Sequence, residues 1–265
     1  MQPSSRPAGV LAKSAKILAC FRQKPGGLAL GEICEVTRIN KSSAHRLLSQ
    51  MAAGGLIERS DDGRYVIGRA LFQLGLLAPK PQELRSVAHP LLNDLARETG
   101  ETVSLSILDG PDIILLDVIE SLHEFRMVAR IGSVKPFHLT SLGKVTAAFL
   151  SDAKLGQLFR SLRLPLEAPT PHSVSDLARL RDDLSQIRRR GYALSDQEYV
   201  LGVRAAAAAV FSAHGEAEAA VGISGPVSRL SMERLSAMAG SVVSAADKVT
   251  ELLGGAPHSI KSLLD

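Results

Sequence analysis

A short polar run, residues 41–50, holds the side chains best suited to bind another molecule. Its polar members are Lys41, Ser42, Ser43, His45, Arg46 and Gln50. The apolar residues Ala44, Leu47, Leu48 and Met51 recur between and after them at helical spacing. This pattern predicts a helix with one polar and one apolar face. Hydroxyl groups can hydrogen-bond to phosphates, and Arg or Gln side chains can reach base-pair edges in the major groove, so such a helix is suited to reading DNA.

Two of these side chains also have a plainer interpretation. Arg46 precedes a pair of core leucines and could be a surface charge without a ligand, instead of a group that reads a base. For His45 we expect either a phosphate contact or simple exposure to solvent, and not a titrating role. Both interpretations stay open at the level of sequence.

Basic residues also flank a predicted hairpin. The segments 56–59 and 64–67 alternate like two strands around Ser60-Asp61-Asp62-Gly63, and Asp-Gly in such a place is a strong turn signal. Arg59 and Arg64 flank the tip, where they could contact phosphates or the minor groove, and Tyr65 adjoins them as a further candidate. A basic hairpin directly after a DNA-reading helix is typical of a wing.

The charge of the chain is concentrated in its first third. Residues 1–80 contain twelve Lys and Arg against five Asp and Glu, a net charge of +7, so the other 185 residues carry −3 of the total of +4. This asymmetry predicts a module that binds a polyanion, joined to a module of another kind.

The elements that must position these residues follow from the apolar spacing and the breakers. Helices are expected over 11–21 and 30–36, a turn over 37–40, and an N-cap at Asn40 or Ser42 before the polar helix. Three helices and a wing in this order predict a winged helix-turn-helix. We expect a flexible tail over 1–9, a DNA-binding domain over 10–70, a linker over 71–83 and a second domain over 84–256.

The second domain is expected to be α+β. Pro79-Lys80-Pro81 is interpreted as a break before an amphipathic helix over 84–98. Further helices are expected over 142–150, 155–160, 173–190 and 231–253, the third with a Ser173-x-x-Asp176 capping pattern. Strands are expected over 101–108, 113–120, 126–131, 192–196, 205–212 and 217–224. Strands with helices on their flanks define this class.

Catalytic and cofactor chemistry is not apparent in the sequence. There is no Gly-rich phosphate loop before a helix, no serine elbow and no metal-ligand spacing, so we expect neither an enzyme nor a bound cofactor or metal. His138 has no nucleophile or orienting acid beside it and is interpreted as structural, and Cys20 and Cys34 as core residues. No apolar run is long enough to span a membrane, and we expect a cytoplasmic protein.

Several short motifs make the chain resemble the IclR-type transcription regulators, named for the isocitrate lyase regulator. The resemblance runs from about Leu11 to Leu253. Its motifs are residues 41–48, 63–68, 100–103 and 132–144, Arg190-Gly191-Tyr192, Glu198 with Gly202-Val203-Arg204, and Ser224-Gly225-Pro226-Val227-Ser228-Arg229. Each motif is modest by itself, but their order and spacing make chance resemblance improbable.

The resemblance implies properties that the residues alone do not give. It implies a GAF-like effector-binding domain, joined by a linker helix to the winged domain, and homodimers that can form tetramers. It implies that backbone amides at Ser141, Leu142 and Gly143 bind the acid group of an effector, which agrees with the affinity of helix N-termini for anions. It also places side chains around the effector, namely Ser195, Ala205, Gly222 and Ser224, with Met127, Lys135 and Val203 at the wall.

The chain departs from the members that bind small oxo-acids at three of these positions. Ser195, Ala205 and Gly222 stand where those relatives carry Asp, Cys and Ser, whereas Ser224 is retained. Smaller and less polar residues predict a larger cavity and an effector bulkier than pyruvate, such as an aromatic or longer organic acid. The alternative is that Ala205 and Gly222 merely suit strand packing.

The functional hypothesis is a transcription regulator that binds a double-stranded operator as a homodimer or tetramer and responds to an organic acid. We expect a repressor of a catabolic operon. Two alternatives stay open: an enzyme of small-molecule metabolism with a basic N-terminal appendage, and a ligand-binding protein whose winged helix contacts other proteins.

Overall fold

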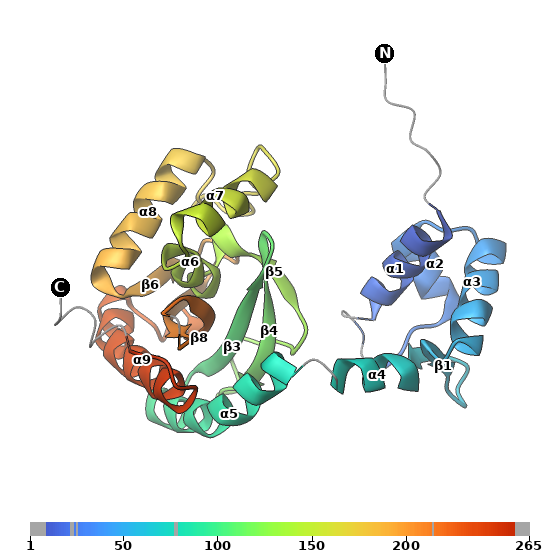
Figure 1. Cartoon of the computed structure of the whole chain (residues 1–265), viewed down its shortest axis with the longest axis horizontal. Coiled ribbons are helices and arrows are strands. Elements are labelled where there is room, and N and C mark those ends of the chain that lie inside the picture. The colour runs from blue at the N-terminus through green and yellow to red at the C-terminus, as the bar shows by residue number, and fades with distance from the viewer. Residues whose placement is uncertain (1–8, 22–23, 25, 77–78, 214, 258–265) are drawn as a thin grey trace, which may run out of the picture. The chain divides into compact units, whose positions relative to one another are not determined.

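The structure is a computed structural model that describes residues 9–21, 24, 26–76, 79–213 and 215–257. The chain divides into two compact units, Met1–Gln82 and Glu83–Asp265 (Figure 1). Most of the tail expected over 1–9 lies outside the described residues. None of the described helices is long and apolar enough to cross a membrane.

The first unit contains helices and one hairpin. Its elements are α1 (Val10–Cys20), α2 (Leu30–Thr37), α3 (Lys41–Ala53), β1 (Ile57–Arg59), β2 (Tyr65–Ile67) and α4 (Arg69–Leu76). The strands β1 and β2 pair antiparallel, as the hairpin prediction required. The apolar face expected for α3 is buried, and Ile17, Ile33, Leu47, Leu48 and Ile57 are central to this core.

The turn between α2 and α3 has a defined geometry. Arg38 ends α2 in the left-handed conformation with φ = 58°, and its N–H donates to the Cys34 carbonyl at 2.9 Å. Asn40 is the N-cap of α3, because its side-chain oxygen accepts from the Ser43 N–H at 2.9 Å. Of the two caps that the sequence allowed, the structure therefore has Asn40.

The second unit is built on a six-stranded antiparallel sheet with the order β5-β4-β3-β8-β7-β6. The strands are β3 (Thr102–Asp109), β4 (Asp112–Ile119), β5 (Val134–Pro136), β6 (Tyr192–Asp196), β7 (Val203–Phe211) and β8 (Ala217–Pro226). Apart from β5, each matches an expected strand to within two residues at either end.

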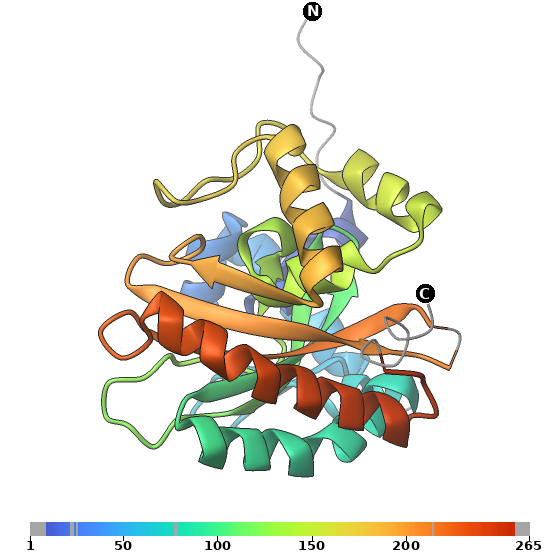
Figure 2. The ribbon, with the colours of Figure 1, turned by 90° about the vertical axis from the view of Figure 1, so that its left-hand side faces the viewer.

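Helices cover both faces of this sheet, as Figure 2 shows. Helices α5 (Pro79–Thr99) and α9 (Met232–Leu252) run side by side on one face and share an apolar core with β3, β7 and β8. The other face packs against α6 (Ser141–Ala148), α7 (Asp152–Ser161) and α8 (Leu177–Arg190). A single 3-10 turn, η1 (Phe137–Leu139), leads from β5 into α6.

Three expected elements differ from the structure. Residues 126–131 form no strand. Their backbone does not pair with a neighbouring strand, and the Met127 carbonyl instead accepts a hydrogen bond from the Thr102 hydroxyl at 2.8 Å. The chain then turns at Gly132, with φ = 79°, and β5 follows. Ser173 does not begin a helix, since its hydroxyl donates to the Glu198 carbonyl at 2.7 Å and Asp176 caps α8 instead.

The third difference concerns Pro79-Lys80-Pro81, which opens α5 instead of breaking the chain before it. Proline is tolerated in the first turn of a helix, where its missing N–H would have no partner in any case. The segment expected as a linker also contains most of α4. The connection between the two units is therefore helical in its described part.

Candidate functional site

The exposed face of α3 presents the polar residues expected to bind DNA. Lys41, Ser42, His45, Arg46 and Gln50 are exposed, and Ser43 is half-buried at the cap. Within the described residues, no hydrogen bond or ion pair involves the side chains of His45, Arg46 or Gln50. These groups are therefore free to bind a ligand, while the opposite face of α3 is fixed in the core.

The hairpin residues differ from one another in their freedom. Arg59 is exposed and makes one long hydrogen bond, 3.4 Å from its Nε to the Gly63 carbonyl. Arg64 instead donates to the Gly27 carbonyl at 3.2 and 3.0 Å and to Glu32 at 2.9 Å. Tyr65 is buried in the core. Arg64 and Tyr65 thus hold the hairpin to the helices, whereas Arg59 is available.

A cavity in the second unit gathers the residues expected to bind an effector. Nine of the ten line it: Met127, Lys135, Ser141, Leu142, Ser195, Val203, Ala205, Gly222 and Ser224. Other lining residues that the sequence did not single out include Ser104, Thr140, Tyr199 and Val200. The space not occupied by atoms is about 640 Å³, part of it open to solvent. The cavity lies on the face of the sheet that α6 covers.

Gly143, the tenth expected residue, has a packing role. A Cβ atom there would lie 2.4 Å from the backbone of Phe137, so α6 can approach the turn before it only if this position is glycine. At Gly222 a Cβ would lie 2.7 Å from the Ala206 carbonyl oxygen and 3.0 Å from Leu142. The side chain missing at Gly222 therefore makes room for α6 and adds little free volume, which leaves Ser195 and Ala205 as the substitutions that could widen the cavity.

The N-terminus of α6 borders the cavity with unpaired donors. Thr140 caps the helix by accepting from the Gly143 N–H at 3.0 Å, and its carbonyl accepts from the Lys144 N–H. The N–H groups of Ser141 and Leu142 have no acceptor among the described residues. Unpaired N–H groups and the helix dipole favour a negative ligand at this end of α6.

Lys135 is the one ammonium group that the described lining contributes. Its Nζ lies 5.6 Å from the centroid of the Tyr199 ring, a cation–π contact. Burial lowers the pKa of Lys135, because an ammonium group is less well solvated in the cavity wall than in water. Lys135 therefore lies in an environment that would favour an anion beside it.

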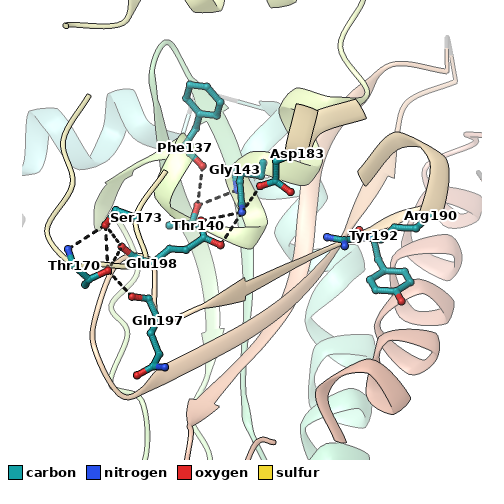
Figure 3. Close-up of polar contacts among 11 residues, drawn as sticks. Phe137, Thr140, Gly143, Thr170, Ser173, Asp183, Arg190, Tyr192, Gln197 and Glu198 are labelled. Carbon is teal, nitrogen blue, oxygen red and sulfur yellow. Dashed lines mark hydrogen bonds and ion pairs between the residues drawn. The ribbon is translucent and has the colours of Figure 1, made fainter. Parts of the chain in front are cut away.

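A buried ion cluster forms around Lys144 of α6, and Figure 3 shows its polar contacts. The Lys144 ammonium donates to Asp183 at 2.7 Å and to both Glu198 oxygens at 2.8 and 2.9 Å. Burial raises the pKa of the Glu198 carboxyl, and the charge of Lys144 opposes that shift. Thr170 and Ser173 donate to the backbone carbonyl of Glu198 at 3.2 and 2.7 Å. The cluster fixes the segment that leads directly to Tyr199 at the cavity wall.

Other motif residues prove to be structural. Glu101 is fully buried and binds the Arg229 guanidinium through two contacts of 2.6 and 2.7 Å, which joins two motifs 128 residues apart. His138 is buried, and its Nε2 donates to the Glu167 carbonyl at 3.0 Å. Sequence reasoning missed the Glu101 and Lys144 pairs. The available signal was a charged residue within an otherwise apolar motif, which requires a buried partner.

The described residues contain no group of three or more His, Cys, Asp and Glu placed to hold a metal ion. Both cysteines are free thiols, Cys20 buried and Cys34 partly buried. Burial raises the pKa of the Cys20 thiol, as expected for a core residue.

Comparison with known proteins covers both units. A family model described as "IclR helix-turn-helix domain" matches residues 10–61. A second, described as "Bacterial transcriptional regulator IclR C-terminal", matches residues 78–251. The chain is 34% identical over 256 residues to the "Transcriptional repressor IclR" of Escherichia coli K12, covering 96% of this chain and 93% of that protein. It is 33% identical over 248 residues to the "Acetate operon repressor" of Salmonella typhimurium, covering 92% and 90%.

Solved structures share the fold. The IclR protein of Thermotoga maritima superimposes with a TM-score of 0.70 at 28% identity, covering 92% of this chain and 98% of that one. An IclR homolog from Microbacterium hydrocarbonoxydans, solved in complex with 4-hydroxybenzoate, gives a TM-score of 0.77 at 23% identity, with 92% and 99% covered. The expected α+β fold, with an N-terminal helix-turn-helix and a C-terminal effector domain, is confirmed.

Proposed function

The chain belongs to the IclR family of bacterial transcriptional regulators, and we propose that it represses transcription by binding operator DNA through α3 and the β1–β2 hairpin. The observation that carries this proposal is the free polar face of α3, where Arg46, His45 and Gln50 have no partners among the described residues. Lys41, Ser42, Ser43 and Arg59 would contact phosphates around them. Arg64 and Tyr65 would act mainly by holding the hairpin.

The second part of the proposal is an organic-acid effector in the cavity beside α6. Its carboxylate would accept from the N–H groups of Ser141 and Leu142, with the hydroxyls of Ser195 and Ser224 nearby. Met127, Val203 and Ala205 would contact its carbon skeleton. The relative solved with 4-hydroxybenzoate supports the idea that this fold can hold an aromatic acid. We infer from the small side chains of Ser195 and Ala205 that this acid is larger than pyruvate.

The repressor assignment draws on the relatives, two of which are named as repressors. We propose a cytoplasmic homodimer or tetramer that controls a catabolic operon, because a dimer presents two recognition helices to two half-sites of an operator. Effector binding would shift the population of conformers that bind the operator.

A mobility-shift titration on the promoter of the neighbouring operon tests the proposal. We expect a retarded complex that unlabelled random DNA does not displace at moderate salt, and that an organic acid weakens. The control is the variant Arg46→Ala, which should weaken the specific complex while keeping salt-sensitive binding to random DNA. Absence of any sequence preference at low salt, with and without acids, would contradict the proposal.

A further inference from the structure

The effector cavity contains two chemically different kinds of polar group. Ser195 on β6, Ala205 on β7 and Ser224 on β8 are register partners across three neighbouring strands, so two hydroxyls lie in this row. Lys135 lies on β5, the strand at the opposite edge of the same sheet. Both groups nevertheless line one cavity, whose lining also includes the apolar residues Ile113, Leu115, Leu142 and Ile223. The cavity therefore carries hydroxyl groups and an ammonium group on different strands, with apolar side chains among them.

The ammonium of Lys135 has no counter-ion in this cavity. No Asp or Glu is among the residues that line it, and no ion pair or hydrogen bond of Lys135 occurs within the described part of the chain. Within the described residues, the Lys135 ammonium contacts the Tyr199 ring. By contrast, Lys144, which is fully buried, is held by two carboxylates. An unpaired cation in a pocket wall is costly unless a ligand supplies the anion.

The position of Lys135 is fixed from both sides. Its own strand pairs with β4 through Ile113. Tyr199 follows Glu198 directly, and Glu198 is held by Lys144, Thr170 and Ser173. The contact between Lys135 and Tyr199 therefore joins two fixed segments, so the ammonium is positioned before a ligand arrives.

We propose that Lys135 binds a second anionic group of the effector, so that the effector of this chain is a dicarboxylic acid that spans the cavity from the α6 N-terminus to β5. This proposal rests on the proposed function and specifies it. One carboxylate would lie at Ser141 and Leu142, the other at Lys135, and the carbon chain would contact the apolar residues of the lining. The charge of the ligand would then complement the helix dipole and the ammonium together.

Calorimetry with matched acids tests this proposal on the full chain. Each pair has one chain length and differs by one carboxylate: butyrate and succinate, pentanoate and glutarate, hexanoate and adipate. For at least one length, we expect the diacid to bind ten-fold or more tightly than the monoacid. Lys135→Met should reduce this ratio to about one without weakening the monoacid, and Lys135→Arg should keep part of it.

Lys154→Met is the control, because Lys154 is exposed, pairs with Glu216 and does not line the cavity. It should leave the ratio unchanged. Equal binding of both members of every pair by the wild-type chain, or an unchanged ratio in Lys135→Met, would overturn the proposal while leaving an organic-acid effector intact. If the folded wild-type chain bound none of these acids, nor benzoate and phthalate, the proposed function itself would fail in its effector part.

Discussion

Two arginines of the first unit, Arg46 and Arg64, show how similar residues can differ in role. Both belong to the basic part of the chain, and both were expected to contact DNA. Arg46 is exposed and its guanidinium is free of described partners, whereas Arg64 donates to the Gly27 carbonyl and to Glu32. Glu32 is itself stabilised as an anion, because hydrogen bonds from Lys24 and from the Ala29 N–H lower its pKa. Arg64 is thus part of a local ionic network.

We predict opposite effects for the two alanine variants. Arg46→Ala should cost roughly 1–3 kcal/mol of operator affinity and relax specificity at one base pair, with unchanged thermal stability. Arg64→Ala should lower the free energy of unfolding of the first unit by roughly 1–2 kcal/mol, because hydrogen bonds to a part-buried carbonyl are lost. Fluorescence anisotropy on operator and random DNA, together with thermal unfolding, separates them. Equal losses on both DNAs for Arg46→Ala would exclude base reading.

Lys135 gives a prediction about pH. Because burial lowers its pKa below 10.5, the unfolded chain keeps the proton in a range where the folded chain has lost it. Stability from this group therefore rises with pH through that range, and the full cost of the buried charge is present at neutral pH. Lys135→Met should raise the free energy of unfolding at pH 7 by about 1 kcal/mol, and the gain should shrink towards pH 10. Denaturant unfolding at several pH values measures it, and a constant gain would contradict the assignment.

At the scale of elements, strand β4 serves two faces of the sheet. Ile113 and Leu115 line the cavity, but the register with β3 then slips, because Leu105 pairs with Asp117 and Ser106 with Leu115. Leu116 is the extra residue of this β-bulge. The bulge turns the buried Asp117 towards α5, where its carboxylate binds His89 at 2.6 Å and Arg85 at 3.5 Å. A single strand thus contacts both the cavity and α5.

The contacts of the Asp117 carboxylate with His89 and Arg85 should stabilise the docking of α5 on the sheet. Asp117→Asn keeps the shape but removes the charge, so we predict a loss of roughly 1–2 kcal/mol in the free energy of unfolding of the second unit. The cost stays moderate because His89 and Arg85 are each half-exposed and can be hydrated. The control is Asp94→Asn on α5. Asp94 forms an exposed ion pair with Arg97, which should contribute less than about 0.5 kcal/mol to the free energy of unfolding. Urea unfolding compares the two, and equal effects would contradict the role of Asp117.

Local pattern predicted the elements whose signals lie within a few residues. The apolar stripe of α3, the Asp-Gly turn and the alternation of β6 each depend on contiguous sequence, and the structure has all three. The prediction of a strand over 126–131 was wrong. Alternating apolar and polar residues indicate which side chains are buried, but they do not show whether the backbone pairs with another strand. Those residues do alternate in burial, yet the Thr102 hydroxyl donates a hydrogen bond to the Met127 carbonyl and no strand ladder forms.

Features that depend on distant partners could not be predicted from the sequence. The capping pattern at Ser173 predicts a helix start, but the Ser173 hydroxyl donates its hydrogen bond to the Glu198 carbonyl, 25 residues away. The partners of Lys144 lie 39 and 54 residues further along the chain. For the cavity, the family resemblance located nine lining residues, whereas Tyr199 was missed because its contact with Lys135 exists only in the folded chain.

For the whole molecule, the shared element is α5. The boundary between the two compact units, after Gln82, falls within this helix. Its later residues Leu84, Ala88, Leu92 and Leu95 are buried in the core of the second unit. The turns of α5 before Pro90, which include the buried Leu84 and Ala88, can transmit a change at the sheet to the chain that precedes them, because bending them would break their own hydrogen bonds. Coupling between acid and DNA should therefore depend on the helical character of residues near the boundary.

Thermodynamic linkage makes this expectation quantitative. If an acid lowers operator affinity by some factor, typically 5- to 150-fold for coupled sites, bound operator must lower the affinity for the acid by the same factor. We predict that the double variant Glu83→Gly, Ser86→Gly reduces this factor towards one, since each exposed glycine weakens the helix by about 1 kcal/mol. Affinities for the acid alone and for DNA alone should stay within about two-fold.

The matched control is Glu83→Ala, Ser86→Ala, which removes the same side chains but favours the helix. It should keep the wild-type factor, so that a loss in the glycine variant reports on helix continuity and not on the two side chains. Anisotropy titrations of operator with and without the tightest-binding acid of the calorimetric series give the factor. If both double variants kept it, α5 would not carry the coupling, and if both lost it, the side chains of Glu83 and Ser86 would carry it instead.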